Sequence, residues 1–76
     1  MDWQDRISVD PKVLVGKPVI KGTRIAVEFL MELVANGWTM DQILRQYDHL
    51  TPEDIQACVA YASEVLKSDR ALGLPA

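Results

Sequence analysis

The sequence predicts a mainly α domain in which a short N-terminal β segment precedes three helices. From residue 26 to about residue 67, apolar residues recur at helical spacing in three stretches, and these stretches are bounded by typical capping residues. Before residue 26 the apolar runs are short and are interrupted by glycine and proline, which favours strands and turns. A chain of 76 residues is expected to form a single domain.

The N-terminal part, residues 1–25, is a basic segment of expected strands and turns. Residues 6–9 alternate polar and apolar side chains, as a half-buried strand does, and Asp10-Pro11 then indicates a turn. The apolar runs at residues 13–15 and 19–20 are too short to distinguish a strand from a buried loop. We therefore expect one or two short strands here.

The first helix is predicted over residues 26–36, with Gly37 at the position where helices commonly end. Before Asn36 its polar side chains are Glu28 and Glu32, which form one narrow stripe. A helix that is apolar around most of its circumference has to be covered on most sides. It is either a central core helix or the interface helix of a homodimer. We favour the homodimer, because so small a domain buries little surface alone.

Two further helices follow after short connections and complete the region of three helices, residues 26–67, before a short tail at 68–76. Thr39 and Gln42 form a capping-box pattern for a helix to about residue 48. Thr51 and Pro52, followed by two acids, begin the third helix, which should fade near residue 68. The expected buried positions are Met40, Ile43, Leu44 and Tyr47 in the second helix, and Ile55, Cys58, Val59, Ala62, Val65 and Leu66 in the third.

Charge is distributed unevenly along a chain whose net charge is −3. Residues 12–24, which we call the basic block, contain four bases and no acid. Residues 25–66 contain Arg45 as their one base against seven acids. Gly16, Pro18 and Gly22 give the basic block a defined shape, because glycine permits turns and proline fixes the backbone. The block therefore predicts a cationic surface for an anionic partner.

Several segments of the chain together resemble one known family. They are residues 7–12, the run GKPVIKGTRI at residues 16–25, Asn36-Gly37-Trp38 and Tyr61-Ala62. They are similar to the bacterial domain-of-unknown-function family 433, which is grouped with antitoxins of toxin–antitoxin modules. The resemblance covers nearly the whole chain and implies a trihelical, homeodomain-like (helix-turn-helix) fold after a short β segment. Ala26 departs from the family pattern, in which proline is common at this position.

The resemblance also implies a function and partners. Family members are expected to bind and inhibit a PIN-like ribonuclease toxin, to form homodimers and to repress their own operon by binding operator DNA. An alternative is a DNA-binding transcriptional regulator without a toxin, and another is a plain protein-interaction module. The third helix begins with acids that phosphates would repel, so the basic block is the better anion-binding candidate. The candidate nucleic-acid or toxin-binding residues are Lys12, Lys17, Lys21, Thr23, Arg24 and Arg70.

An enzyme is not expected. Glu53 and Asp54 are explained by helix capping, His49 lies in a turn, and Cys58 falls on an apolar helix face. One cysteine and one histidine cannot supply a structural zinc site, and we expect no metal, cofactor or small-molecule substrate. The absence of a long apolar run predicts a cytoplasmic protein without a membrane span.

Overall fold

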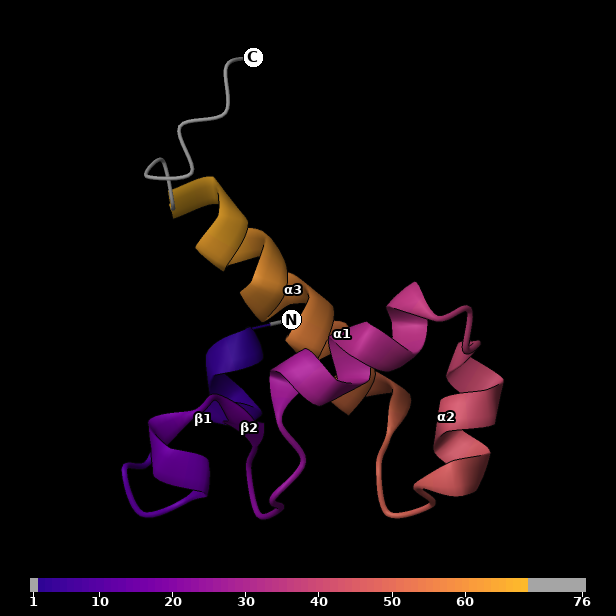
Figure 1. The fold of residues 1–76 in the computed structure, drawn as a ribbon, viewed down its shortest axis with the longest axis horizontal. Coiled ribbons are helices and arrows are strands. Elements are labelled where there is room, and N and C mark those ends of the chain that lie inside the picture. The colour runs from indigo at the N-terminus through magenta and orange to yellow at the C-terminus, as the bar shows by residue number, and fades with distance from the viewer. Residues whose placement is uncertain (1, 69–76) are drawn as a thin grey trace.

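The computed structural model describes residues 2–68 and confirms the predicted fold class. A 3₁₀ turn at Trp3–Asp5 and strand β1 (Ile7–Ser8) are followed by a second 3₁₀ turn at Leu14–Gly16 and strand β2 (Val19–Ile20). Three helices then complete the small bundle shown in Figure 1. They are α1 (Val27–Ala35), α2 (Met40–Gln46) and α3 (Pro52–Ser68).

The two strands form an antiparallel pair that leads directly into α1. Ile7 lies opposite Ile20 in the pair, and both side chains are buried. The pairing continues past β2 through a bridge between Val19 and Ala26. The Pro18 carbonyl accepts a hydrogen bond from the backbone N–H of Val27 at 2.9 Å. The first turn of α1 is therefore fixed by the β segment.

The end of α1 confirms the role predicted for Gly37, whose φ is +90°. The Gly37 N–H donates to the carbonyl of Val34 at 3.0 Å, and the Trp38 N–H donates to that of Leu33 at 3.0 Å. These two bonds make a Schellman motif, which satisfies carbonyls at the helix end and turns the chain sharply. The motif reverses the chain towards α2 and fixes the backbone at Trp38.

Both predicted N-caps are present. Thr39 and Gln42 exchange side-chain and backbone hydrogen bonds in a full capping box at α2. Thr51 and Asp54 do the same at α3, at 3.0 and 3.2 Å. Helix α2 ends at Gln46, two residues earlier than expected, because Tyr47 leaves helical geometry with a ψ of 74°.

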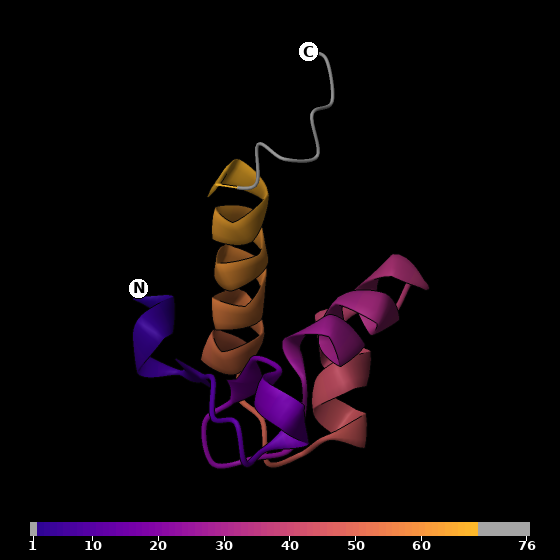
Figure 2. The same cartoon turned by 60° about the vertical axis from the view of Figure 1, so that its left-hand side comes forward.

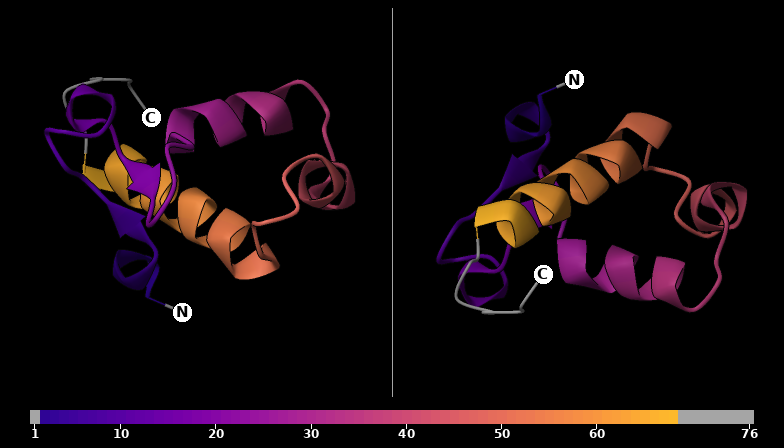
Figure 3. Two further views of the ribbon diagram at one scale, coloured as in Figure 1. Left: turned by 90° about the horizontal axis from the view of Figure 1, so that it is seen from below. Right: turned by 90° about the horizontal axis from the view of Figure 1, so that it is seen from above.

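The core draws on both strands and all three helices. Helix α3 lies between the N-terminal 3₁₀ turn and α1, and α2 lies at the end of the molecule opposite the strands (Figure 3). The buried core cluster consists of Ile7, Ile20, Val27, Leu30, Ile43, Leu50, Ile55, Ala57 and Cys58.

The buried faces predicted for α2 and α3 were wrong in part. Met40 is exposed, and in α3 the side chains of Val59, Val65 and Leu66 are 50%, 42% and 65% exposed. In α3 the second half of the helix projects beyond the other elements, which leaves Val65 and Leu66 exposed (Figures 1 and 2). The apolar pattern of α3 continues past the point where the rest of the described chain covers it.

The apolar run at residues 13–15 is neither a strand nor a buried loop. Leu14 and Val15 have positive φ angles of 48° and 57°, and Gly16 follows with a φ of 82°. Three successive residues in the left-handed region are costly for Leu and Val, whose Cβ atoms crowd the backbone there. Val15 is also 93% exposed, so this strained turn presents an apolar side chain inside the basic block.

Candidate functional site

The best-defined part of the basic block is residues 21–24, which we call the cationic turn. The Ile20 N–H donates to the carbonyl of Ile25 at 3.0 Å and so closes the turn at its base. The Thr23 hydroxyl donates to the Ile20 carbonyl at 2.8 Å and accepts from the Ile25 N–H at 3.0 Å. Gly22 supplies the left-handed residue, with a φ of 77°. Thr23, a predicted binding residue, therefore uses its hydroxyl within the turn.

The cationic turn carries two exposed bases, Lys21 and Arg24. The backbone N–H of Lys21 donates to the Arg6 carbonyl at 2.8 Å, which ties the turn to the chain just before β1. Neither base has an acidic partner within 4.0 Å among residues 2–68. Two positive side chains are thus presented on a backbone that is already ordered, so a partner would order little besides the side chains themselves.

The remaining bases of the block are placed differently. Lys17 forms an ion pair with Glu28 of α1, so its charge is partly neutralised. Lys12 is exposed and follows an Asx turn, in which Asp10 Oδ1 accepts from the Lys12 N–H at 2.9 Å. The loop holding Lys12 and the cationic turn lie along the same lower edge in Figures 1 and 2. Among the described residues, Lys12, Lys21 and Arg24 are therefore the bases of the block without an acidic partner within 4.0 Å; Arg70 lies outside the described residues.

The predicted shaping residues of the basic block are explained by its backbone. Gly16 occupies the left-handed region, with a φ of 82°, which glycine adopts without strain. Pro18 lies between the strained turn and β2, and its carbonyl accepts from the first helical N–H of α1. These residues hold the loops in place and do not themselves offer charge.

An ion pair that the sequence did not reveal joins the β segment to α3. Arg6 Nη1 lies 3.1 Å from Asp54 Oδ1, and the carboxylate is largely buried. The same carboxylate caps α3 through its other oxygen. Asp54 is therefore structural, as its capping position suggested, and Glu53 is left as the exposed acid at the start of α3. The alternation around Arg6 indicated a strand but gave no sign of this partner, which is 48 residues away.

The residues considered for chemistry occupy structural or solvent positions. His49 is exposed in the turn before α3. Cys58 is fully buried, and burial, with the charge of Asp54 as a second cause, raises the pKa of its thiol to about 12. Within residues 2–68, no three Asp, Glu, His or Cys side chains gather as metal ligands would. No helix in that same range is long and apolar enough to cross a membrane.

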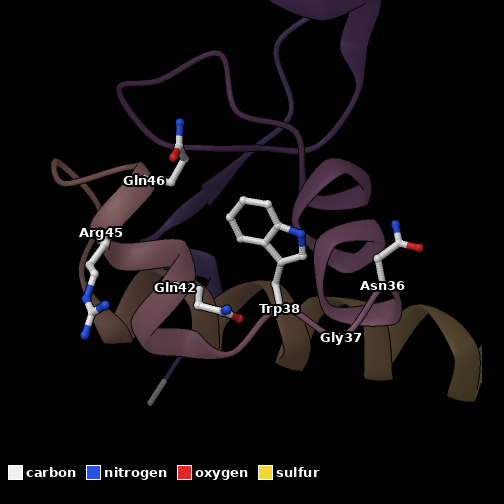
Figure 4. Close-up of a pocket in the computed structure, with 6 residues that line it drawn as sticks. All are labelled: Asn36, Gly37, Trp38, Gln42, Arg45 and Gln46. Carbon is white, nitrogen blue, oxygen red and sulfur yellow. The ribbon is translucent and has the colours of Figure 1, made fainter.

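A pocket of about 470 Å³ lies where α1 turns into α2. Figure 4 shows the indole of Trp38 at its centre, with the side chains of Asn36 and Arg45 directed away from the ring. The Gln42 amide oxygen is already engaged in the capping box. Because its polar groups do not converge on one point, the pocket is a surface recess of the α1–α2 turn.

The fold and the basic block together define a small trihelical protein in which a basic segment precedes the three helices in the sequence. The chain belongs to the family described as "Protein of unknown function (DUF433)", whose model matches residues 7–62. The matched region includes the whole basic block and the Schellman motif. It also confirms the resemblance inferred from the sequence.

A solved structure supports the same assignment, and a second protein shares a short stretch of sequence with this chain. The crystal structure of a DUF433 member protein from Anabaena variabilis superposes with a TM-score of 0.79 at 30% sequence identity. The match covers 93% of this chain and 71% of that one. An uncharacterized protein from Archaeoglobus fulgidus is 71% identical over 24 residues, which is 32% of this chain and 67% of the relative.

Proposed function

We propose that this protein is an antitoxin-like member of its family that binds a PIN-like ribonuclease and inhibits it. The observation that carries the proposal is the cationic turn, in which an internally bonded backbone presents Lys21 and Arg24 to solvent. A metal-dependent nuclease concentrates carboxylates around its divalent ions, so its active site is a strongly anionic target. A guanidinium can pair with such carboxylates through two parallel hydrogen bonds.

The charge distribution supports a protein partner ahead of nucleic acid. Residues 25–66 carry seven acids and one base, and a phosphate backbone would be repelled by most of that surface. A nuclease active site requires only a local cationic contact, which Arg24, Lys21 and Lys12 supply along one edge. The exposed Val15 lies in the same block and offers an apolar contact next to the charges.

Co-expression with the product of the neighbouring gene, which we expect to be a PIN-like nuclease, tests the proposal. We expect the nuclease alone to arrest growth of a bacterial host, and the wild-type chain to restore growth and to copurify with it. Arg24→Glu should weaken binding by about 30-fold or more, as loss and reversal of an interface charge does. Arg45→Glu is the matched control, because it makes the same charge change at an exposed position on α2.

Two results would contradict the proposal. If the neighbouring product is neither toxic nor bound, the protein is not an antitoxin. If Arg24→Glu and Arg45→Glu weaken binding equally, the cationic turn is not the contact and only net charge matters. Circular dichroism of both variants shows whether the fold is intact.

Repression of the shared operon is the second part of the proposal, with α2 and α3 arranged as a helix-turn-helix. The exposed positions of α3 before Lys67 include Glu53, Gln56 and Glu64, which makes the helix a poor reader of DNA by itself. Lys12 and the two bases of the cationic turn would then provide the phosphate contacts. Binding of the promoter fragment should fall steeply as salt concentration rises. No mobility shift at low salt, with or without the nuclease, would remove repression from the proposal.

A further inference from the structure

Within residues 2–68, an apolar surface on the second half of α3 is left uncovered. A groove of about 340 Å³ runs between α1 and α3, with Val27 and Met31 on one side and Ala62, Val65 and Leu66 on the other. Its lining is almost entirely apolar. Tyr61 also lines the groove, and Trp3 packs edge-on against it with ring centroids 4.9 Å apart. The groove is thus an apolar recess that the other described residues leave open.

The apolar surface of this groove continues the seam that builds the core. Ile55 and Cys58 of α3 are buried, and the same helical spacing then reaches Ala62, Val65 and Leu66. Within the described chain, α1 and the strands cover the first of these stretches and leave the second open (Figure 2). An apolar helix face of this kind is normally covered in the functional state.

We propose that a second copy of this chain covers the groove, and that the homodimer forms through the α1–α3 groove and the projecting half of α3. The expectation from sequence placed a dimer interface on α1 alone. In the structure, Val27 and Leu30 of α1 are buried in the chain's own core, while Phe29 and Val34 are exposed on α1 outside the groove. The interface proposed here uses the side of α1 that faces the groove.

The patch has the shape that a twofold interface requires. In such an interface one surface meets an identical surface, so it must contain both a recess and the projection that fills it. The groove is the recess, and Leu66, which is 65% exposed at its border, is the projection. Ala62 between them is small and permits close approach of the two α3 helices.

The charges around the groove also suit a second copy. Lys17 and Glu28 pair on the side of α1, and Glu64 and Lys67 are exposed on α3. With two charges of each sign, two identical patches meet without net repulsion. An acidic or a basic partner would find no complementary excess of charge here. The cationic turn faces the opposite edge from the projecting end of α3, so it stays accessible in the dimer (Figure 1).

Analytical ultracentrifugation of the purified full chain tests this inference without any partner. We expect about twice the monomer mass of 8.5 kDa at micromolar concentration. Leu66→Glu and Val65→Arg should each raise the dimer dissociation constant at least tenfold, because each places a charge in the apolar interface. Val9→Glu is the matched control, since Val9 is 59% exposed but lies in the N-terminal segment, and it should leave the mass unchanged.

A monomer at every concentration up to about 100 µM would overturn the inference. A dimer that Leu66→Glu and Val65→Arg leave intact would also overturn it, because the interface would then lie elsewhere. The same holds if the wild-type chain is monomeric and Leu66→Glu abolishes nuclease binding, since the groove would then belong to the nuclease. Failure of the antitoxin proposal would leave these masses unaffected, so the two tests are independent.

Discussion

The two halves of helix α3 have similar sequence patterns but very different surroundings. In residues 52–58, Ile55, Ala57 and Cys58 are almost completely buried, whereas Val59, Val65 and Leu66 in residues 59–68 are 42–65% exposed. Both halves carry apolar side chains at helical spacing. The difference shows that periodicity identifies which face of a helix is apolar and does not identify what covers it.

The reactivity of two thiols should show the largest contrast between these halves. Because burial raises the pKa of Cys58 to about 12 from 9.0, its thiolate population near pH 8 is about 10³-fold lower than in the unfolded chain. Native Cys58 should therefore resist a thiol reagent until the protein unfolds. A Leu66→Cys variant should react with one equivalent of reagent at once in dilute solution. Rapid labelling of Cys58 in the folded protein would contradict its enclosure.

The same pKa shift predicts how stability depends on pH. Folding favours the neutral Cys58 thiol, so its contribution to the free energy of unfolding is fully present below pH 9 and is lost as pH rises from 9 towards 12. Urea unfolding of the wild type and of Cys58→Ala should therefore converge in stability over that range. If the difference in free energy of unfolding between the wild type and Cys58→Ala stays constant from pH 8 to 11, the pKa of Cys58 is not raised by folding.

Truncation of side chains in the two halves should have unequal effects on the monomer. Ile55→Ala is expected to cost about 2–4 kcal/mol, because it leaves a cavity in the core. Leu66→Ala should cost less than about 0.5 kcal/mol when measured by urea unfolding at a concentration too low for association. Equal losses would mean that the projecting half of α3 is packed within the monomer.

A smaller effect is expected at the start of α3, where Asp54 both caps the helix and pairs with Arg6. Asp54→Ala should destabilise the protein by about 1–2 kcal/mol, because Thr51 and Arg6 both lose a bonded oxygen. Glu53→Ala is the control, since it removes an exposed carboxylate from the same turn. If thermal unfolding shows the same loss of stability for both variants, Asp54 stabilises α3 only through its charge near the helix dipole and not through its hydrogen bonds.

The helices could be predicted from sequence because their boundaries are encoded locally. Thr39 with Gln42, Thr51 with Pro52, and Gly37 each act within one turn of the helix they begin or end, so no knowledge of distant contacts was needed. The end of α2 was less certain, because it depends on Tyr47, whose ring packs edge-on against Phe29 of α1. Contacts of that kind are not visible in a single helical pattern.

The candidate site was predicted as a charged segment, but its internal arrangement was not. Glycine and proline indicated turns, yet nothing in the sequence shows that Lys17 pairs with Glu28 or that Thr23 bonds within the cationic turn. The left-handed run at Leu14 and Val15 was also unpredictable, because residues of these types rarely adopt it. The pairing of Arg6 with Asp54 depends on the whole fold bringing the β segment to α3.

Amide hydrogen exchange along α3, measured at two protein concentrations, tests the contrast between its halves most directly. The amides of residues 55–58 should exchange slowly at both concentrations, because their exposure requires global unfolding. Residues 59–68 should exchange quickly in dilute solution and slow down at high concentration, when a second copy covers them. Uniform protection along α3 at the lowest concentration, or exchange in residues 59–68 that does not depend on concentration, would contradict the account.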